Sequence, residues 1–227
     1  MVMARKRAKE TDGDTARQRL TVQDWADAAL AAMGEGGLAA VAVEPLAARL
    51  GTTKGSFYWH FANRDALIEA TLEHWAQSRT EGMITELAGE RDPGERLRQL
   101  LFRATRRAAE DPLEVSLLAS ATDPRVAAVL ARVTDRRLGY IATLFVELGF
   151  PEDEAQHRGL LAYTTYLGHT QLSHAVPRSL PDGGARERHL DAILETLLHP
   201  KGTSGTRPGV QGSSPRHPAA ETTVERG

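Results

Sequence analysis

Residues 46–61 read Leu-Ala-Ala-Arg-Leu-Gly-Thr-Thr-Lys-Gly-Ser-Phe-Tyr-Trp-His-Phe. The apolar positions before Gly51 predict a short helix over residues 44–50, and a second short helix is expected over residues 53–61. Gly51 separates them because glycine adopts backbone angles that end a helix. Two short helices around a glycine turn are typical of a helix-turn-helix, in which the second helix enters the major groove of DNA and the first braces it.

The second helix carries side chains that suit contact with DNA. Thr53, Ser56 and His60 are spaced to share one face, where they offer hydrogen-bond donors and acceptors to bases and phosphates. Lys54 supplies positive charge that displaces counterions from the duplex. Gly55 has no side chain, so the helix backbone can approach the DNA closely. This pattern predicts that the helix is a recognition helix.

The aromatic residues of the same stretch allow a second interpretation. Phe57 and Phe61 are four residues apart and predict an anchor on the core, whereas Tyr58 adds a hydroxyl and a flat ring. The run from Phe57 to Phe61 is also compatible with a plain core stripe of a helical bundle. That alternative leaves the lysine, the glycine and the hydroxyl residues of so short a helix unexplained. Arg64 follows a predicted cap at Asn63 and is placed to meet a further phosphate.

Helical spacing of apolar residues extends over most of the chain. Thr21 is expected to cap a first helix that ends near Gly34, and Asn63 to cap a long helix to about residue 82. Further helices are expected over about 93–110, 112–121, 124–131, through Tyr140 to Leu148, 152–175 and 185–198. The fold class predicted is all-α, with an N-terminal three-helix helix-turn-helix domain, a C-terminal helical bundle and about nine helices in total.

Composition divides the chain into four expected parts. Residues 1–19 form a basic flexible arm, residues 20–64 the DNA-binding domain, and residues 65–199 a helical ligand-binding and dimerisation domain. Residues 200–227 are rich in Gly, Pro, Ser and Thr, and we expect them to be disordered because they cannot bury enough apolar surface. The basic arm would add phosphate contacts, or it is simply a solvated tail.

The bulk numbers exclude several classes of protein. The 227 residues carry a formal net charge of −2, so DNA binding has to rest on local features rather than on global charge. The absence of cysteine excludes disulfides. The basic N-terminus has no apolar segment behind it, as a signal peptide would, and no stretch is long and apolar enough for a membrane span. We therefore expect a cytoplasmic protein with no membrane partner.

Signals of catalysis or metal binding are weak. Residues 51–56 superficially resemble a phosphate-binding loop, but the lysine precedes the second glycine and no strand leads into it. His157, His169 and His174 share one predicted helix without the spacing that metal ligands need. No nucleophile and base are arranged as in known hydrolases. We expect no enzyme activity, no metal and no cofactor.

The run from Gly51 to Leu67, which continues as Ala-Asn-Arg-Asp-Ala-Leu after Phe61, resembles the signature of the TetR family of bacterial repressors. The family pattern is Gly-x-Ser/Thr-Lys-Gly-x-Leu/Phe-Tyr-x-His-Phe, a short link, and Lys/Arg-Glu/Asp-x-Leu. The resemblance covers about residues 20–75. It implies a homodimer that reads a palindromic operator in double-stranded DNA, with an unidentified small-molecule effector bound in the C-terminal domain.

The same resemblance assigns roles to residues. DNA contacts are implied for Thr52, Thr53, Lys54, Gly55, Ser56, Tyr58, Trp59 and His60, with Arg64 on a phosphate. The family often has threonine at the start of the second helix, where this chain has Ala42 and Val43, so that phosphate contact is missing. The hydroxyl of Thr21 remains available to the DNA instead.

Candidates for the effector site are aromatic residues of the C-terminal part, because ligand pockets combine apolar walls with a few polar groups. The candidates are Trp75, Phe102, Tyr140, Tyr163, Tyr166 and His169, each of which is otherwise a core residue. The helix at 152–175 is also expected to form the dimer contact together with the last helix, through Leu190, Ile193, Leu194 and Leu197.

The sequence thus predicts a ligand-responsive transcriptional regulator, a repressor, that binds its operator through the helix at about 53–61. Two alternatives stay open. One is a DNA-binding architectural protein without a ligand, and the other is a helical small-molecule-binding protein or enzyme whose aromatic helix is only core. A cavity of roughly a few hundred Å³ in the C-terminal part, the scale of small-molecule sites, would distinguish ligand sensing from a filled core.

Overall fold

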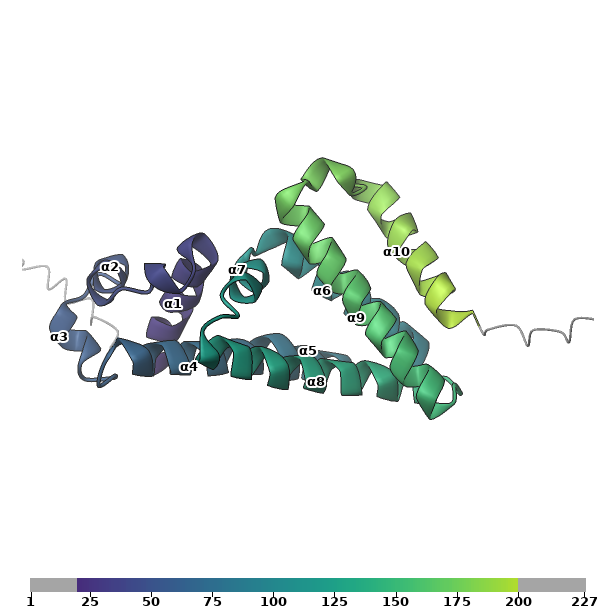
Figure 1. The fold of residues 1–227 in the computed structure, drawn as a ribbon, viewed down its shortest axis with the longest axis horizontal. Helices are drawn as coiled ribbons and strands as arrows, with labels where there is room; N and C mark the ends of the chain where they lie inside the picture. Colours follow the sequence, from purple (N-terminus) through teal and green to yellow (C-terminus); the bar gives the residue numbers. More distant parts are fainter. Residues whose placement is uncertain (1–19, 200–227) are drawn as a thin grey trace, which may run out of the picture. The chain divides into compact units, whose positions relative to one another are not determined.

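The computed structural model describes residues 20–199, and every regular element among them is a helix (Figure 1). The all-α prediction is therefore confirmed. If α4, the π turn after it and α5 are counted as one continuous helix, these residues hold nine helices besides two short 3-10 turns. The chain divides into one unit up to Leu197 and a second from Leu198 onward. The predicted basic arm 1–19 and disordered tail 200–227 lie outside the described residues.

The N-terminal helices begin and end where local chemistry predicts. Helix α1 (Val22–Gly36) starts at a capping box, in which the Asp24 backbone nitrogen donates to the Thr21 hydroxyl at 3.2 Å. The Thr21 backbone nitrogen in turn donates to the Asp24 carboxylate at 2.7 Å. A short 3-10 turn (Leu38–Ala40) leads to α2 (Val43–Arg49). Gly51 then turns the chain toward α3 with a φ of 63°, which favours glycine.

Helix α3 (Lys54–Phe57) is shorter than the predicted range of 53–61. After Phe57 the chain continues in tight turns, in which the Trp59 and His60 nitrogens donate to the carbonyls of Ser56 and Phe57. Asn63 then adopts an extended backbone and caps the next helix, with its side chain accepting from the Ala66 nitrogen at 2.9 Å. His60 consequently lies beyond the helix, and the predicted helical face of Thr53, Ser56 and His60 is wrong.

The long helix that follows is interrupted near its middle. Helix α4 (Arg64–Ala76) passes into a π-helical turn (Gln77–Glu81) and then into α5 (Gly82–Leu87), five residues beyond the predicted end at about 82. A π turn inserts one residue into the helix and often lies at a functional site. Here it rotates the side chains after Ala76 relative to those before it.

The remaining helices agree closely with the sequence pattern. They are α6 (Pro93–Glu110), α7 (Leu113–Ala119), α8 (Pro124–Glu147), α9 (Glu152–Ala175), a 3-10 turn (Pro177–Ser179) and α10 (Gly183–Leu198). The predicted bounds 93–110 and 152–175 are confirmed. The stretch at 124–131 is not separate from the helix through Tyr140, because no residue between them breaks the backbone. Among the described residues no helix is long and apolar enough to cross a membrane.

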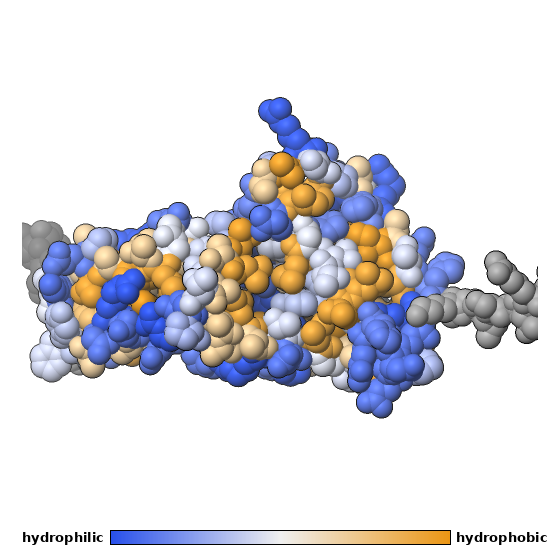
Figure 2. Space-filling view, in the orientation of Figure 1, coloured by the Kyte–Doolittle hydropathy of each residue, from blue (hydrophilic) through white to orange (hydrophobic). Residues whose placement is uncertain are grey.

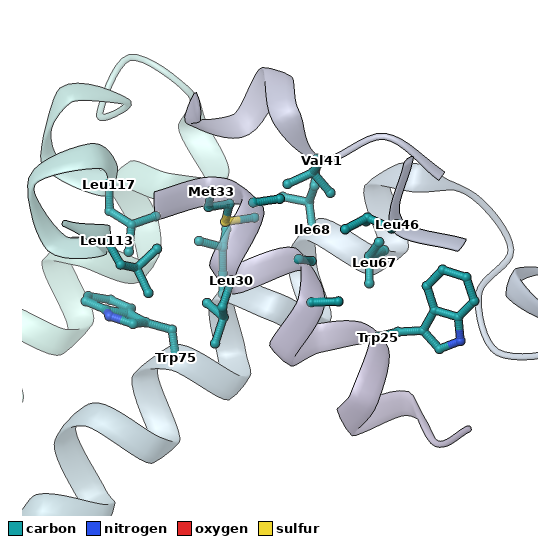
Figure 3. Packing of buried hydrophobic residues seen from close by; sticks show 14 of the residues in the cluster. Trp25, Leu30, Met33, Val41, Leu46, Leu67, Ile68, Trp75, Leu113 and Leu117 are labelled. Carbon is teal, nitrogen blue, oxygen red and sulfur yellow. The ribbon is translucent and has the colours of Figure 1, made fainter. Parts of the chain in front are cut away.

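A single apolar cluster joins the helix-turn-helix to the helices behind it (Figure 3). Figure 3 shows Leu30 and Met33 of α1 between Ile68 of α4 and the pair Leu113 and Leu117 of α7. Trp75, which is 1% exposed, belongs to the same cluster near the end of α4. The contiguous packing means that movements of α4 are passed on to the DNA-binding helices.

Helices α8 and α9 pack closely at a glycine. A Cβ on Gly159 would lie 3.3 Å from the backbone nitrogen of Ala142 and 3.6 Å from the Leu138 carbonyl oxygen. The two backbones thus approach more closely than a larger residue permits. This crossing sets the position of the inward-facing side chains of both helices.

Candidate DNA-binding surface and effector cavity

The short helix α3 is held by two phenylalanines that point inward. Phe57 is fully buried, with its ring 5.4 Å from that of Trp25 in an edge-on arrangement and 5.5 Å from that of Phe61. The next two side chains point the opposite way, since Tyr58 is 57% and Trp59 is 87% exposed. A tryptophan so exposed costs solubility unless a partner covers it. As predicted, Phe57 and Phe61 are buried and anchor the helix, whereas the side chains between them include exposed ones.

Lys54 at the start of α3 is exposed and paired with a carboxylate. Its Nζ lies 2.8 Å from Oε1 of Glu44 on α2. The hydrogen bond between them raises the pKa of Lys54 and lowers the pKa of Glu44 from their ordinary values. Lys54 is therefore fully charged at neutral pH, but part of its field is cancelled by its neighbour until a phosphate competes for it.

The other residues predicted to contact DNA differ in their exposure to solvent. Thr53 and Gly55 are exposed, whereas Thr52, Ser56 and His60 are half-buried around α3. The Thr21 hydroxyl is engaged in the capping box, where it also donates to the Asp24 carboxylate at 2.7 Å. Of these positions, Thr53 and Gly55 are therefore the ones that a partner could contact without rearrangement.

Arg64 is directed into the protein rather than outward. Its Nε donates to the Val41 carbonyl and its Nη2 to the Leu38 carbonyl, both at 2.5 Å. These charge-assisted bonds hold the turn between α1 and α2 against the start of α4. The structure thus gives Arg64 a bracing function that the sequence analysis did not predict.

The C-terminal part contains a cavity of about 100 Å³ between α4, the π turn, α5, α6, α7, α8 and α9. Its wall is mostly apolar. On the face shown in Figure 2, hydrophobic residues lie among polar ones where Figure 1 has α7, α6 and α9. Trp75, Tyr140, Tyr163 and Tyr166 line the cavity, as predicted. The core is therefore not completely filled, but the cavity is smaller than the few hundred Å³ expected of a small-molecule site.

Two predicted cavity residues lie elsewhere. The Phe102 ring is covered by the Arg98 guanidinium, 4.4 Å from the ring centre, on another side of α6. His169 lies beside His189 of α10, with ring centres 5.3 Å apart. Steps of three residues fall short of a helical turn by about 60°, so the series Tyr163, Tyr166, His169 rotates away from the cavity.

One end of the cavity holds a buried ion pair that the sequence analysis missed. Arg137 Nη1 lies 2.5 Å from Oε1 of Glu114, and the Tyr166 hydroxyl donates to Oε2 of Glu114 at 2.9 Å. Arg137 Nε also donates to the Thr80 hydroxyl at 3.1 Å, in the π turn. Burial and the Glu114 charge raise the pKa of Tyr166, so this hydroxyl remains a donor.

Arg137 stays positively charged although it is buried. Burial by itself would lower the pKa of the guanidinium, but the charge of Glu114 and the tyrosines Tyr166 and Tyr163 outweigh burial and raise it. A signal for this residue existed in the sequence, because Val133, Arg137 and Ile141 follow one another at four-residue steps. A charged residue on an otherwise apolar stripe points to a buried polar site.

Among residues 20–199 no three histidine, aspartate or glutamate side chains are grouped so that they could hold an ion.

The last helix differs from the dimer contact predicted for it. Leu190, Leu194 and Leu197 are buried within the protomer. Ile193, the fourth residue predicted for this contact, is only partly buried. Exposed apolar side chains are found on α9, the other helix of the predicted contact, where Leu160 and Leu161 are about half exposed and Leu172 is 40% exposed.

The fold and the surface around α3 define the DNA-binding part of a helical transcription regulator. The model of the family described as "Bacterial regulatory proteins, tetR family" matches residues 26–71. The resemblance to the TetR family seen in the sequence is therefore confirmed over these residues, which include the helix-turn-helix. Comparison with curated proteins gives no significant match.

Solved structures of similar fold are regulators too. A transcriptional regulator from Rhodococcus sp. Rha1 has a TM-score of 0.65 at 20% identity, covering 79% of this chain and 96% of that chain. A TetR regulator from Chloroflexus aurantiacus has a TM-score of 0.62 at 21% identity, with coverages of 78% and 91%. FadR from Bacillus subtilis, solved with stearoyl-CoA, has a TM-score of 0.57 at 15% identity, with coverages of 78% and 98%. Such identities establish the shared fold.

Proposed function

We propose that this protein is a ligand-responsive repressor that binds a palindromic operator as a homodimer through α3. The observation that carries the proposal is the opposite orientation of neighbouring aromatics: Phe57 and Phe61 are buried, whereas Tyr58 and Trp59 are exposed beside Lys54. A helix that served only as core would not hold an indole almost entirely in solvent. The arrangement suits a helix that is fixed from behind and reads DNA from the front.

The proposed contacts are the residues expected from the sequence, but we divide them into direct and surrounding contacts and give Arg64 a structural role. We propose that Lys54, Tyr58, Trp59, Thr53 and Gly55 meet DNA directly. Thr21, Thr52, Ser56 and His60 lie around them and complete the surface. Arg64 acts mainly from within, since two backbone carbonyls hold its guanidinium. The proposed domain division keeps residues 20–64 for DNA and residues 65–199 for the effector and the dimer.

The proposed dimer contact is the exposed side of α9. Leu160, Leu161 and Leu172 place apolar surface on one helix, and burying it against a second copy would be favourable at about 25 cal/mol per Å². Two-fold symmetry of the protein would then match the symmetry of a palindromic operator. The protein would work in the cytoplasm, as a regulator and not as an enzyme.

A route from the cavity to α3 runs through the arginines of α8. Arg132 pairs with Glu73 of α4 at 2.5 Å, and Arg136 pairs with Glu81 of the π turn at 2.8 Å. A ligand that shifts α8 would carry α4 with it, and α4 shares its apolar cluster with the DNA-binding helices. Such a ligand lowers operator affinity only by the difference between its affinities for the two conformations.

The test of DNA binding uses the full chain, DNA fragments selected from its own genome, and a series of salt concentrations. Lys54→Ala should weaken operator binding and lower the slope of log affinity against log salt by about one, as expected for one lost phosphate contact. Arg106→Ala removes an exposed arginine of α6 and should change neither. Absence of any preference for selected over random duplex at moderate salt would overturn the proposal.

A second variant separates the surface from the fold. Trp59→Ala should leave the unfolding midpoint nearly unchanged, because the indole is exposed, and should weaken operator binding clearly. If Trp59→Ala bound the operator as tightly as the wild type, the exposed aromatic would not be part of the DNA surface.

A further inference from the structure

The cavity between α4 and α9 has a carbon-rich wall and one charged end. The wall includes Met83, Ile84, Leu97, Leu101, Ile141 and Ala162. The charged end is formed by Arg79, Arg107, Asp111, Glu114 and Arg137. A ligand that fits both parts has an apolar body and a single polar group.

The charges at this end do not balance. Arg79 pairs with Asp111 at 2.5 Å and Arg137 with Glu114 at 2.5 Å. Arg107 reaches only Glu86, at 4.0 Å, and that carboxylate is about half exposed and is not part of the cavity wall. The cavity wall therefore includes three arginines and two carboxylates, and the third arginine, Arg107, is compensated only by a half-exposed carboxylate that it shares with Arg103.

Arg137 has hydrogen-bonding capacity left. Its Nη1 donates to Glu114 and its Nε to Thr80, but no described residue accepts from its Nη2. A guanidinium has five N–H donors in one plane, so the Nη2 group can serve an acceptor inside the cavity. Glu114, in contrast, already receives a bond on each of its oxygens.

From these observations we infer, on the basis of the proposed function, that the effector is a small organic acid. Its carboxylate accepts hydrogen bonds from Arg137 Nη2 and is compensated by the excess charge of Arg107, while a single ring or short chain fills the apolar wall. A volume of about 100 Å³ is below the few hundred Å³ that drug-sized ligands occupy, so the body is short. The bound carboxylate is neutralised, which removes the usual penalty for burying a charge.

Other ligand classes fit less well. An amine would enter a region with excess positive charge and would have to displace Arg137 or Tyr166 from Glu114. A neutral hydrocarbon would fill the wall but would leave the Arg137 Nη2 without an acceptor. The charge balance and the free donor therefore favour the same class of ligand.

The test compares three probes with the same ring: phenylacetate, phenylacetamide and phenethylamine. Binding to the full-length protein is measured by calorimetry and by the shift of the unfolding midpoint. Phenylacetate should bind about ten- to a hundred-fold more tightly than the amide, which is the range for a hydrogen bond to a charged group. The amine should not bind. Equal affinity for acid and amide, preference for the amine, or no binding by any of the three would each overturn the inference.

Variants then locate the carboxylate. Arg137→Met alone would leave Glu114 buried without a partner and would endanger folding, so the double variant Arg137→Met/Glu114→Met is used. It should fold, still accept the apolar ring and lose the preference for acid over amide. Arg106→Met, outside the cavity, should keep that preference. Retention of the preference in the double variant would contradict the assignment of the carboxylate to Arg137.

A further measurement distinguishes a wrong ligand class from a failure of the proposed function. Operator affinity is measured with and without phenylacetate on the same samples. If phenylacetate binds as described and operator affinity does not change, the ligand class stands and ligand-responsive regulation fails. If the operator is bound but only neutral probes release it, regulation stands and the organic acid is wrong.

Discussion

Lys54 on the recognition helix α3 and Glu44 on α2 form an exposed ion pair, with 2.8 Å between Nζ and Oε1. The pair places a carboxylate next to the cation that is proposed to meet a phosphate. On binding, DNA has to draw Lys54 away from Glu44 or to tolerate a negative charge close to its backbone. If Lys54 contacts DNA as proposed, Glu44 opposes that binding, and the pairing of residues ten positions apart on two helices is not evident from the sequence.

Removing the Glu44 charge should therefore strengthen operator binding. Because exposed ion pairs contribute at most about 1 kcal/mol, Glu44→Gln should raise affinity by up to about fivefold at low salt, and less at high salt. Fluorescence anisotropy with a labelled operator measures the effect. Glu35→Gln, which breaks the exposed pair with Arg49, makes the same change of net charge and serves as the control. An equal gain in both variants would mean that only net charge matters.

Arg64 allows the bracing function to be separated from a phosphate contact. Arg64→Met removes the bonds to the Val41 and Leu38 carbonyls and should lower the free energy of unfolding by about 1–3 kcal/mol. Chemical denaturation of the protein without DNA measures this loss. A variant with normal stability but weakened operator binding would instead assign Arg64 to a phosphate.

Local sequence signals predicted most of the helix boundaries. The capping residues Thr21 and Asn63 and the Asp92-Pro93 start of α6 act over a few residues, so the sequence alone carries the information. Helix α3 was predicted too long because the tight turns after Phe57 have the same apolar spacing as a helix. The π turn at Gln77–Glu81 was also missed, since nothing in the spacing of its residues distinguishes it from an ordinary helix.

The helical spacing of apolar residues could not predict contacts between residues that are distant in the sequence. Arg64 binds carbonyls more than twenty residues upstream, and Arg137 pairs with Glu114 from a different helix. The apolar stripe around Arg137 indicates a buried polar site, but neither arginine's partner can be identified until the helices are packed. Four of the six proposed effector residues do line the cavity, because large side chains on inward helical faces gather in one interior, but their polar partners come from tertiary packing.

The crossing of α8 and α9 predicts opposite effects for two glycines inside helices. Glycine is less favourable than alanine within a helix by about 1 kcal/mol. Gly139→Ala in α8, where nothing lies within 4 Å of the added Cβ, should raise stability by up to that amount. Gly159→Val should lower it, because its side chain meets the Ala142 backbone, which cannot move without shifting α8. Thermal unfolding of both variants checks this, and a stabilised Gly159→Val would show that the crossing is loose.

Asp123 should make the stability of the protein depend on pH in the acid range. Its carboxylate caps α8 by accepting from the Arg125 nitrogen at 2.9 Å, and it also pairs with the Arg125 guanidinium at 2.8 Å. The side-chain hydrogen bond from Arg125 is the main reason that the pKa of Asp123 falls from 3.8 to about 2.

Since the pKa of Asp123 is lower in the folded than in the unfolded chain, its stabilising effect is complete above about pH 4. The effect is lost as the pH falls toward about 2, where the carboxyl group becomes protonated in both states. Asp123→Asn should therefore be less stable than the wild type at neutral pH, and the difference should shrink through this window. Urea unfolding at a series of pH values measures the difference.

Asp135→Asn, an exposed position on the same helix, is the control. A difference between wild type and Asp123→Asn that stays constant down to pH 2 would exclude titration of Asp123 as its cause.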